Sequence, residues 1–181
     1  MVVIIHGGHR KGICYEAATA FDEILKTKAL ATKLIDLRDC QIDYCCGNQP
    51  CYDSGECVFN DYMAKEIVPL LTKSKALIFF TPTYFNMPPA LLKNFIDRCN
   101  FLLTNEDRAK LSFGAWVSGQ TDERSIEDCF NNLATFAEIC NFPLMSEGKI
   151  LRVEANPEQM KVNKDDIEKL EILAAEITTM I

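Results

Sequence analysis

The stretch VVIIHGGHRKGIC, residues 2–14, decides the fold of this chain. Residues 2–6 form a continuous strand-forming run rich in β-branched side chains, which is typical of a central parallel strand buried on both faces. The run ends at two glycines, and a helical pattern with one apolar face follows over residues 14–26. The stretch therefore predicts a buried strand that passes through a glycine-bearing loop into a helix.

The same alternation of strand and helix repeats along the 181 residues. Further strand-like runs occur at 31–37, 75–82, 112–119 and 142–153, and further helix-like patterns at 61–74, 88–103, 126–141 and 164–180. Pro69 is expected to kink the helix in which it lies. Five such units predict an α/β fold, a doubly wound five-stranded parallel sheet in the order 2-1-3-4-5 with helices on both faces. We expect residues 1–181 to form a single domain.

Composition narrows the classes of protein. Hydrophobic residues make up 48% and charged residues 25% of the chain, which is ordinary for a soluble globular protein. No apolar run approaches the ~20 residues of a membrane span, and the opening MVVIIH lacks the basic leader of a secretory signal. The net charge of −7 without a basic tract argues against nucleic acid. We expect a cytoplasmic protein with neither nucleic acid nor membrane as partner, in which clustered cysteines indicate metal or redox chemistry more often than disulfides.

In sheets of this kind, ligands bind beyond the carboxyl ends of the strands, at the switch point between strands 1 and 3. Three loops are predicted at that edge: HGGHRKG at 6–12, TPTYFNMPP at 81–89 and SGQTDER at 118–124. The function should therefore be sought in these three loops.

The first loop has the setting of a phosphate site, because it joins a buried strand to the start of a helix. It is not a P-loop, since Gly12 is followed by Ile13 and Cys14, and its glycines do not fit the dinucleotide fingerprint. Arg10 and Lys11 could meet a phosphomonoester through charge-assisted hydrogen bonds. A plain tight turn with solvated charges is the alternative.

The second and third loops suggest a site for a planar ring. A ring could stack beside Tyr84 or Phe85 while backbone N–H groups of residues 83–86 bond to its edge. The alternative is that both aromatic side chains plug the end of the sheet. Ser118, Gly119 and Gln120 offer a small, flexible backbone that a flat ligand can approach closely. Together with a phosphate site, these features suggest a pocket for flavin mononucleotide (FMN).

Three segments resemble a known family. GGHRKG at 7–12, PTYFNMPPALLKNFIDR at 82–98 and CYDSGECVFNDYM at 51–63 are similar to motifs of the NAD(P)H-dependent FMN reductase and iron–sulfur flavoprotein group of flavodoxin-like proteins. The resemblance runs through about the first 120 residues. It implies a flavodoxin-like fold, bound FMN and a homodimer with the flavin near the subunit interface.

The resemblance also implies which residues contact FMN. Those around the phosphate would be Gly8, His9, Arg10 and Lys11; those along the isoalloxazine would be Pro82, Thr83, Tyr84, Phe85 and Asn86, with Ser118 and Gly119 on the other edge. Where the family loop continues with Asn-Thr or Asn-Ser, this chain has Cys14 and Tyr15, which the resemblance therefore also places at the cofactor. One hydroxyl donor to the phosphate is therefore lost unless Tyr15 or Thr19 replaces it, and we expect weaker binding of FMN than is typical.

Four of the nine cysteines, Cys45, Cys46, Cys51 and Cys57, lie in the stretch DYCCGNQPCYDSGEC at 43–57. A [4Fe–4S] cluster needs four converging thiolates. The family spacing puts Asn48 where the second ligand should be, and adjacent residues such as Cys45 and Cys46 usually point apart. An iron–sulfur cluster, a zinc site, a regulatory disulfide and thiols without a ligand all remain open.

The other cysteines have separate predictions. Cys14 should have a lowered thiol pKa if it is exposed, because it lies at a helix N-terminus beside two cations. Those that fall in or near predicted elements are expected to pack in the core: Cys40, Cys99, Cys129 and Cys140.

The leading hypothesis is an FMN-dependent oxidoreductase that passes electrons from NAD(P)H, its co-substrate, to a small acceptor such as a quinone, a nitroaromatic compound or a flavin. The cofactor performs the chemistry, so no catalytic side chain is assigned. One alternative is an electron carrier with an iron–sulfur cluster in the 45–57 segment. Another is a non-catalytic flavin-binding protein that responds to redox state.

Overall fold

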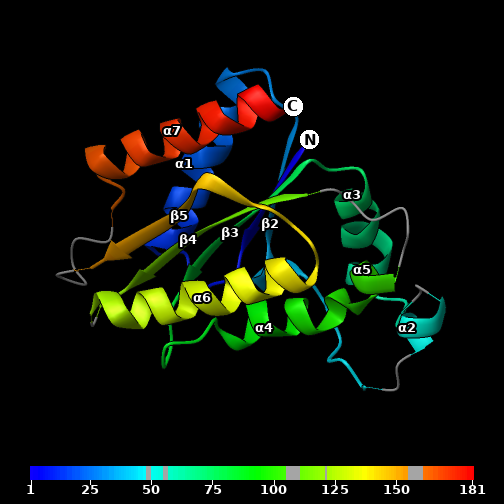
Figure 1. The fold of residues 1–181 in the computed structure, drawn as a ribbon. Coiled ribbons are helices and arrows are strands. Elements are labelled where there is room, and N and C mark those ends of the chain that lie inside the picture. Colours follow the sequence, from blue (N-terminus) through cyan, green and yellow to red (C-terminus); the bar gives the residue numbers. More distant parts are fainter. Residues whose placement is uncertain (48–49, 55–56, 105–110, 121, 155–160) are drawn as a thin grey trace.

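Five parallel strands form the sheet at the centre of the molecule (Figure 1). The computed structural model describes residues 1–47, 50–54, 57–104, 111–120, 122–154 and 161–181. The strands are β1 (Val2–His6), β2 (Thr32–Asp36), β3 (Ala76–Pro82), β4 (Ser112–Gly119) and β5 (Leu144–Val153). Their order is β2-β1-β3-β4-β5, which confirms the predicted sheet.

Burial along the strands follows their place in the sheet. Every residue of β1 and of β4 is buried, as expected for inner strands that helices cover on both faces. Strands β2 and β5 lie at the two edges, and each contains half-buried and exposed residues. The continuous apolar runs seen in the sequence are therefore the inner strands of the sheet.

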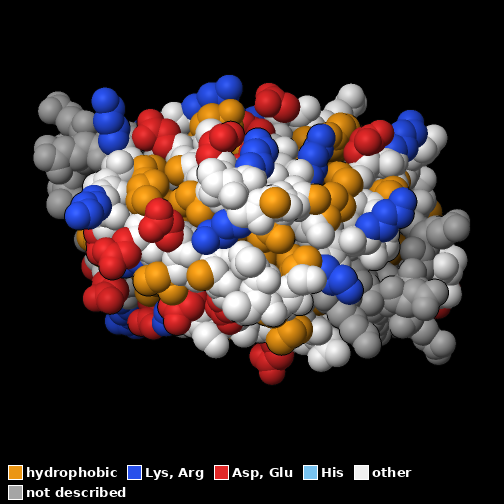
Figure 2. All heavy atoms as spheres, turned by 90° about the horizontal axis from the view of Figure 1, so that it is seen from above, with side chains coloured by type: hydrophobic (Ala, Val, Ile, Leu, Met, Phe, Trp, Pro, Cys, Tyr) orange, Lys and Arg blue, Asp and Glu red, His pale blue; other side chains and the backbone are white. Residues whose placement is uncertain are grey.

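Helices cover both faces of the sheet (Figure 1). On one face α1 (Ile13–Thr27) packs beside α7 (Lys164–Met180), and both contribute to one buried cluster of apolar side chains. Side chains of α3 (Val68–Thr72), α4 (Ala90–Asp97), α5 (Phe101–Thr104) and α6 (Glu123–Ile139) contribute to a second cluster on the other face. Figure 2 shows acidic and basic side chains intermingled over the α1 and α7 face. Among the described helices, none is both long and apolar enough to cross a membrane.

Two predicted helices are divided in the structure. The one at 61–74 consists of a π-helical turn, η2 (Met63–Ile67), followed by α3, whose first turn contains Pro69. In the π turn the Val68 N–H bonds to the Met63 carbonyl, five residues back. Because proline has no N–H and clashes with the carbonyl four residues before it, a wider turn accommodates it.

The helix predicted at 88–103 is also not continuous. It consists of α4, the 3₁₀ turn η3 (Arg98–Asn100) and α5. Two short elements lie outside the predicted set, the 3₁₀ turn η1 (Leu37–Asp39) and α2 (Pro50–Ser54), which carries part of the cysteine-rich stretch.

A buried ion pair joins η3 to the segment that flanks these cysteines. Arg98 Nη1 donates to Asp61 Oδ2 at 2.6 Å, and Nη2 donates to Oδ1 at 3.1 Å. The two side chains are only 1% and 7% exposed. Arg98 Nη1 also donates to the Asp43 carbonyl at 2.7 Å, and the Asp61 carboxylate accepts from the Asp43 and Ala64 backbone N–H groups. The pair therefore holds three separate parts of the chain together.

Candidate functional site

A cleft of about 440 Å³ lies at the carboxyl ends of β1, β3 and β4, where all three predicted loops meet. Its volume is within the usual range of small-molecule sites. The sequence-predicted residues that line it are Gly8, His9, Arg10, Cys14, Pro82, Thr83, Tyr84, Phe85, Asn86, Ser118 and Gly119. Lys11 and Tyr15 do not line it. The structure thus brings together most of the predicted residues, while their binding of a cofactor stays a prediction.

One end of the cleft is the loop between β1 and α1. Helix α1 begins after Gly12, and no side chain caps its first backbone N–H groups. Arg10 is exposed in the same loop. A helix start without a side-chain cap, the positive end of the helix dipole and a guanidinium together form a setting that binds phosphate.

Position 8 of this loop requires glycine because the His6 imidazole lies close to it. A Cβ atom at this position would lie 2.8 Å from His6 Nε2. The absence of a side chain at position 8 therefore leaves room for the imidazole directly beneath the loop.

The other end of the cleft is a tight turn after β3. Tyr84 and Met87 exchange backbone N–H···O bonds of 3.0 Å, and the two residues between them have positive φ values, +50° at Phe85 and +63° at Asn86. Side chains of α6 hold this strained backbone. The Asn86 amide donates to Asp128 Oδ2 at 2.9 Å. The turn is thus a fixed support for the side chains that it carries.

The aromatic side chains of this turn face outward. Phe85 is fully exposed and Tyr84 is 44% exposed, so the alternative that both rings plug the sheet end is wrong. The rings of His9 and Tyr84 lie 6.1 Å apart at 40° to each other, which places the first two loops face to face. A planar ligand bound here would have aromatic neighbours on both loops.

Only part of the predicted backbone donor set is available in this turn. The Thr83 N–H bonds to the Ser118 carbonyl at 2.8 Å, and the Tyr84 N–H bonds to Met87. This leaves the N–H groups of Phe85 and Asn86 as candidate donors to the edge of a bound ring.

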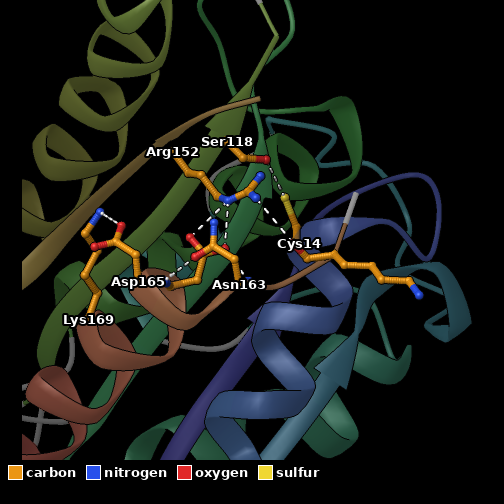
Figure 3. A network of polar contacts seen from close by, with 8 residues as sticks. Cys14, Ser118, Arg152, Asn163, Asp165 and Lys169 are labelled. Atoms are coloured by element: carbon orange, nitrogen blue, oxygen red, sulfur yellow. Dashed lines mark hydrogen bonds and ion pairs between the residues drawn. The ribbon is translucent and has the colours of Figure 1, made fainter. Parts of the chain in front are cut away.

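The floor of the cleft is formed by the end of β4. A Cβ atom at Gly119 would lie 2.7 Å from Thr83 Cγ2, so glycine lets the second and third loops approach each other. Beside it, the Cys14 thiol and the Ser118 hydroxyl are hydrogen-bonded at 3.1 Å (Figure 3).

Cys14 differs from its prediction. Its side chain is buried, and burial raises the pKa of the thiol to about 12, with a further rise from the Glu154 carboxylate, against the lowering effect of the Ser118 hydrogen bond. The lowered pKa expected for an exposed thiol does not arise, because desolvation outweighs the helix N-terminus. Cys99, Cys129 and Cys140 are buried as predicted, and Cys40 is half-buried.

Behind Ser118, a polar network ties β5 to the start of α7 (Figure 3). Arg152 Nε donates to both carboxylate oxygens of Asp166 at 3.0 Å, and Arg152 Nη2 donates to the Lys161 carbonyl at 3.4 Å. Asp166 and Asn163 also cap the helix, each side chain accepting from the backbone N–H of the other. This network fixes the strand end that carries Glu154 to the edge of the cleft.

The two predicted residues outside the cleft form a separate cluster. Lys11 Nζ lies 4.9 Å above the Tyr15 ring, and the Arg38 guanidinium lies 5.7 Å from the same ring. The Thr19 hydroxyl donates to the Tyr15 carbonyl at 2.9 Å. Neither Tyr15 nor Thr19 lines the cleft, so the geometry does not support either as a substitute for the missing phosphate donor.

Six lining residues lie outside the predicted site set: His6, Gly12, Ile13, Gln120, Ser125 and Glu154. The strand-end rule could have found His6 and Glu154, because each lies where a parallel strand ends at the ligand edge. No local motif marks either residue.

The cysteine-rich stretch lies away from the cleft. Figure 1 shows α2 beside α5, on the side of the molecule opposite the arrowheads of β4 and β5. Burial raises the pKa of the Cys51 thiol, and the Cys57 and Cys45 thiols raise it further. Within the described ranges, no group of three or more His, Cys, Asp or Glu side chains is arranged to hold a metal ion. The iron–sulfur and zinc alternatives for these cysteines stay predictions, and Asn48 lies outside the described residues.

Comparisons with known proteins identify the family of this chain. A family model described as NADPH-dependent FMN reductase matches residues 1–148. An iron–sulfur flavoprotein of Clostridioides difficile is 29% identical over 106 residues, and an iron–sulfur flavoprotein of Archaeoglobus fulgidus is 34% identical over 74 residues. These matches cover 57% and 41% of this chain, but only 47% and 33% of the relatives. The chain therefore spans less than half the length of the curated relatives that it matches.

A solved structure has the same fold over nearly the whole chain. The flavodoxin, WrbA-like protein from Agrobacterium tumefaciens superimposes with a TM-score of 0.68 at 18% identity, covering 98% of this chain and 94% of that one. This likeness confirms the predicted flavodoxin-like fold. The family model covers most of the chain and confirms the resemblance seen in the motifs. The chain belongs to the NADPH-dependent FMN reductase family.

Proposed function

We propose that the protein is a single FMN-binding domain that acts as an NAD(P)H oxidoreductase and passes electrons to a small acceptor such as a quinone, a nitroaromatic compound or a flavin. The observation that carries the proposal is the cleft itself. Its phosphate setting and its exposed aromatic turn face each other at the switch point of a flavodoxin-like sheet.

The residues of the cleft fit the parts of FMN. The loop of residues 7–12 has uncapped N–H groups and the Arg10 guanidinium for the phosphate. The turn of residues 84–87 has Tyr84 for contact with the ring, and Phe85 and Asn86 N–H groups for its edge. Gly119, where a Cβ would clash with Thr83, lets the second and third loops approach each other at the floor of the cleft.

Bound FMN supplies the chemistry, which is acceptance of two electrons from reduced nicotinamide and their transfer to the acceptor. The chain's own contribution is to bind and orient. Arg10 would neutralise phosphate charge, and the turn, with positive φ at Phe85 and Asn86, would present its N–H groups to a bound ring with little rearrangement. Such fixed donors also stabilise negative charge on a reduced ring.

We also propose a homodimer in which the turn of residues 84–87 contributes to the interface. Phe85 is fully exposed and Met87 is exposed beside it on a backbone that α6 holds in place. Light scattering coupled to size-exclusion chromatography tests this: a dimer in wild type and a monomer in Phe85→Ser supports it, and a monomeric wild type contradicts it.

The function is tested on anaerobically purified protein with added FMN. We expect flavin absorption near ~375 and ~450 nm, which the cofactor itself determines, and oxidation of NADH or NADPH that depends on a quinone acceptor. About four irons per chain would instead support the electron carrier. Bound FMN without nicotinamide oxidation by any acceptor would support the non-catalytic flavin-binding protein. Failure to bind FMN would overturn the proposal.

A further inference from the structure

His6 is a buried residue of the cleft to which the proposed function assigns no role. Its side chain is 0% exposed, and it lines the cleft beneath the loop of residues 7–12. Its Nδ1 atom lies 3.1 Å from Asp36 Oδ1, but Nε2 has no hydrogen-bond partner among the described residues. A buried polar atom without a partner costs about 1–3 kcal/mol. A ligand that bonds to Nε2 would remove this cost.

The hydrogen bond to Asp36 determines which ring nitrogen of His6 can gain or lose a proton. The two residues are directly opposite each other in the register of β1 and β2. Burial would raise the pKa of the Asp36 carboxyl, but hydrogen bonds from Arg38 and His6 outweigh it and hold the pKa below its usual value. Asp36 is therefore a carboxylate at neutral pH. His6 Nδ1 therefore carries a proton and donates a hydrogen bond to Asp36 Oδ1, and Nε2 is the atom that gains or loses a proton.

Two further elements of the described chain, α1 and β3, place residues beside the His6 ring. Tyr15 from α1 meets it edge-on at 5.4 Å, with Lys11 and Arg38 against the Tyr15 ring. On the β3 side, the residue opposite His6 is the apolar Phe80. Burial lowers the pKa of His6 and outweighs the opposing effect of Asp36. His6 is therefore neutral at pH 7 when no further anion is beside it.

We propose that His6 Nε2 takes up one proton from solvent when the cofactor phosphate binds, and donates it in a hydrogen bond to a phosphate oxygen. This inference rests on the proposed function, because it takes the loop of residues 7–12 as the phosphate site. The phosphate supplies a second anion opposite Asp36, and an imidazolium between two anions is strongly favoured. No bond of the phosphate changes. One neutral imidazole and one proton become one imidazolium.

Calorimetry of the wild-type protein tests the proposal directly. FMN and riboflavin, which lacks the phosphate, are titrated in two buffers with different heats of ionisation at about pH 7.5, where the phosphate is already dianionic. We expect FMN binding to take up roughly half to one proton, and riboflavin binding to take up none. The dissociation constant for FMN should rise by up to about tenfold per pH unit as the pH increases.

Substitutions identify the residue that takes up the proton when FMN binds. His6→Gln keeps an amide donor but cannot titrate, so we expect it to abolish proton uptake. His9→Gln replaces the other histidine of the cleft, which is exposed, and should retain the uptake. Asp36→Asn removes the first anion and should reduce it.

The possible failures are distinct. FMN binding without proton uptake in the wild type overturns this inference and leaves the proposed function standing. Equal uptake with riboflavin, or uptake that persists in His6→Gln, also overturns it. Absence of FMN binding overturns the proposed function, and the inference with it.

Discussion

Replacing Arg98 by Met is the sharpest test of the packing around the cysteine-rich stretch. The substitution keeps the volume of the side chain but removes two hydrogen bonds to Asp61 and one to the Asp43 carbonyl. The Asp61 carboxylate is then left almost fully buried without a cation. Breaking a buried ion pair in this way costs about 3–5 kcal/mol. Because two backbone N–H groups still bond to Asp61, we expect a value near about 3 kcal/mol.

Urea denaturation followed by circular dichroism at pH 7 measures this cost. A loss of about 3 kcal/mol corresponds to a melting temperature lower by roughly 6–12 °C for a domain of this size. Lys93→Met on the adjacent α4 removes the exposed pair with Asp97 and serves as the control, with an expected loss of less than about 1 kcal/mol.

The pH dependence of the difference distinguishes an ion pair from simple packing. Burial alone would raise the pKa of Asp61, but the hydrogen bonds from Arg98 and from backbone N–H groups hold it below the usual value. The pair therefore contributes its stability above the unfolded pKa, and loses it as the pH falls through the lowered folded pKa. The difference between wild type and Arg98→Met should be smaller at about pH 3.5 than at about pH 7. An equal difference at both pH values, or a loss no larger than that of the control, would refute the reasoning.

Three further predictions concern the cleft. Arg10→Glu should raise the dissociation constant for FMN by roughly 10–100-fold in a fluorescence titration, because a charge-assisted hydrogen bond is worth about 1.5–3 kcal/mol. Lys11→Glu, outside the cleft, should have a much smaller effect. Equal effects of the two substitutions would place the phosphate elsewhere. Tyr84→Ala should change the fluorescence of bound FMN, since stacked aromatic side chains quench it, and unchanged emission would remove Tyr84 from the ring contact. Cys14, with its thiol pKa raised to about 12, should resist iodoacetamide in the native protein at about pH 8 while the exposed Cys46 reacts, as measured by mass spectrometry; rapid labelling of both would contradict the burial.

The sheet and most of the cleft were predictable because they depend on local patterns. The strand at 112–119 and the helix at 164–180 have the predicted bounds, since unbroken apolar runs and amphipathic periodicity are local properties of a sequence. Residues of the three loops could be placed together by the strand-end rule alone.

Features that depend on long-range contacts were not predictable. Asp36 lies beside His6 only because of the register between β1 and β2, which no local pattern specifies. The buried Cys14 thiol is hydrogen-bonded to Ser118, which is 104 residues away in the chain. The helix predicted at 88–103 is interrupted at Arg98, where this side chain pairs with Asp61. Tertiary contacts therefore accompany the division of a continuous helical pattern.

The Asp166 carboxylate, which bonds to both α7 and β5, affects the local unfolding of these two elements. The same group caps α7 and neutralises the largely buried Arg152 of β5, so the first turn of the helix cannot fray without leaving that guanidinium uncompensated. We therefore expect local unfolding of this turn to be coupled to disruption of the end of β5. In hydrogen exchange, the amides of the first turn of α7 and of the end of β5 should be protected to a similar degree and exchange as one cooperative unit, although helix ends ordinarily exchange first.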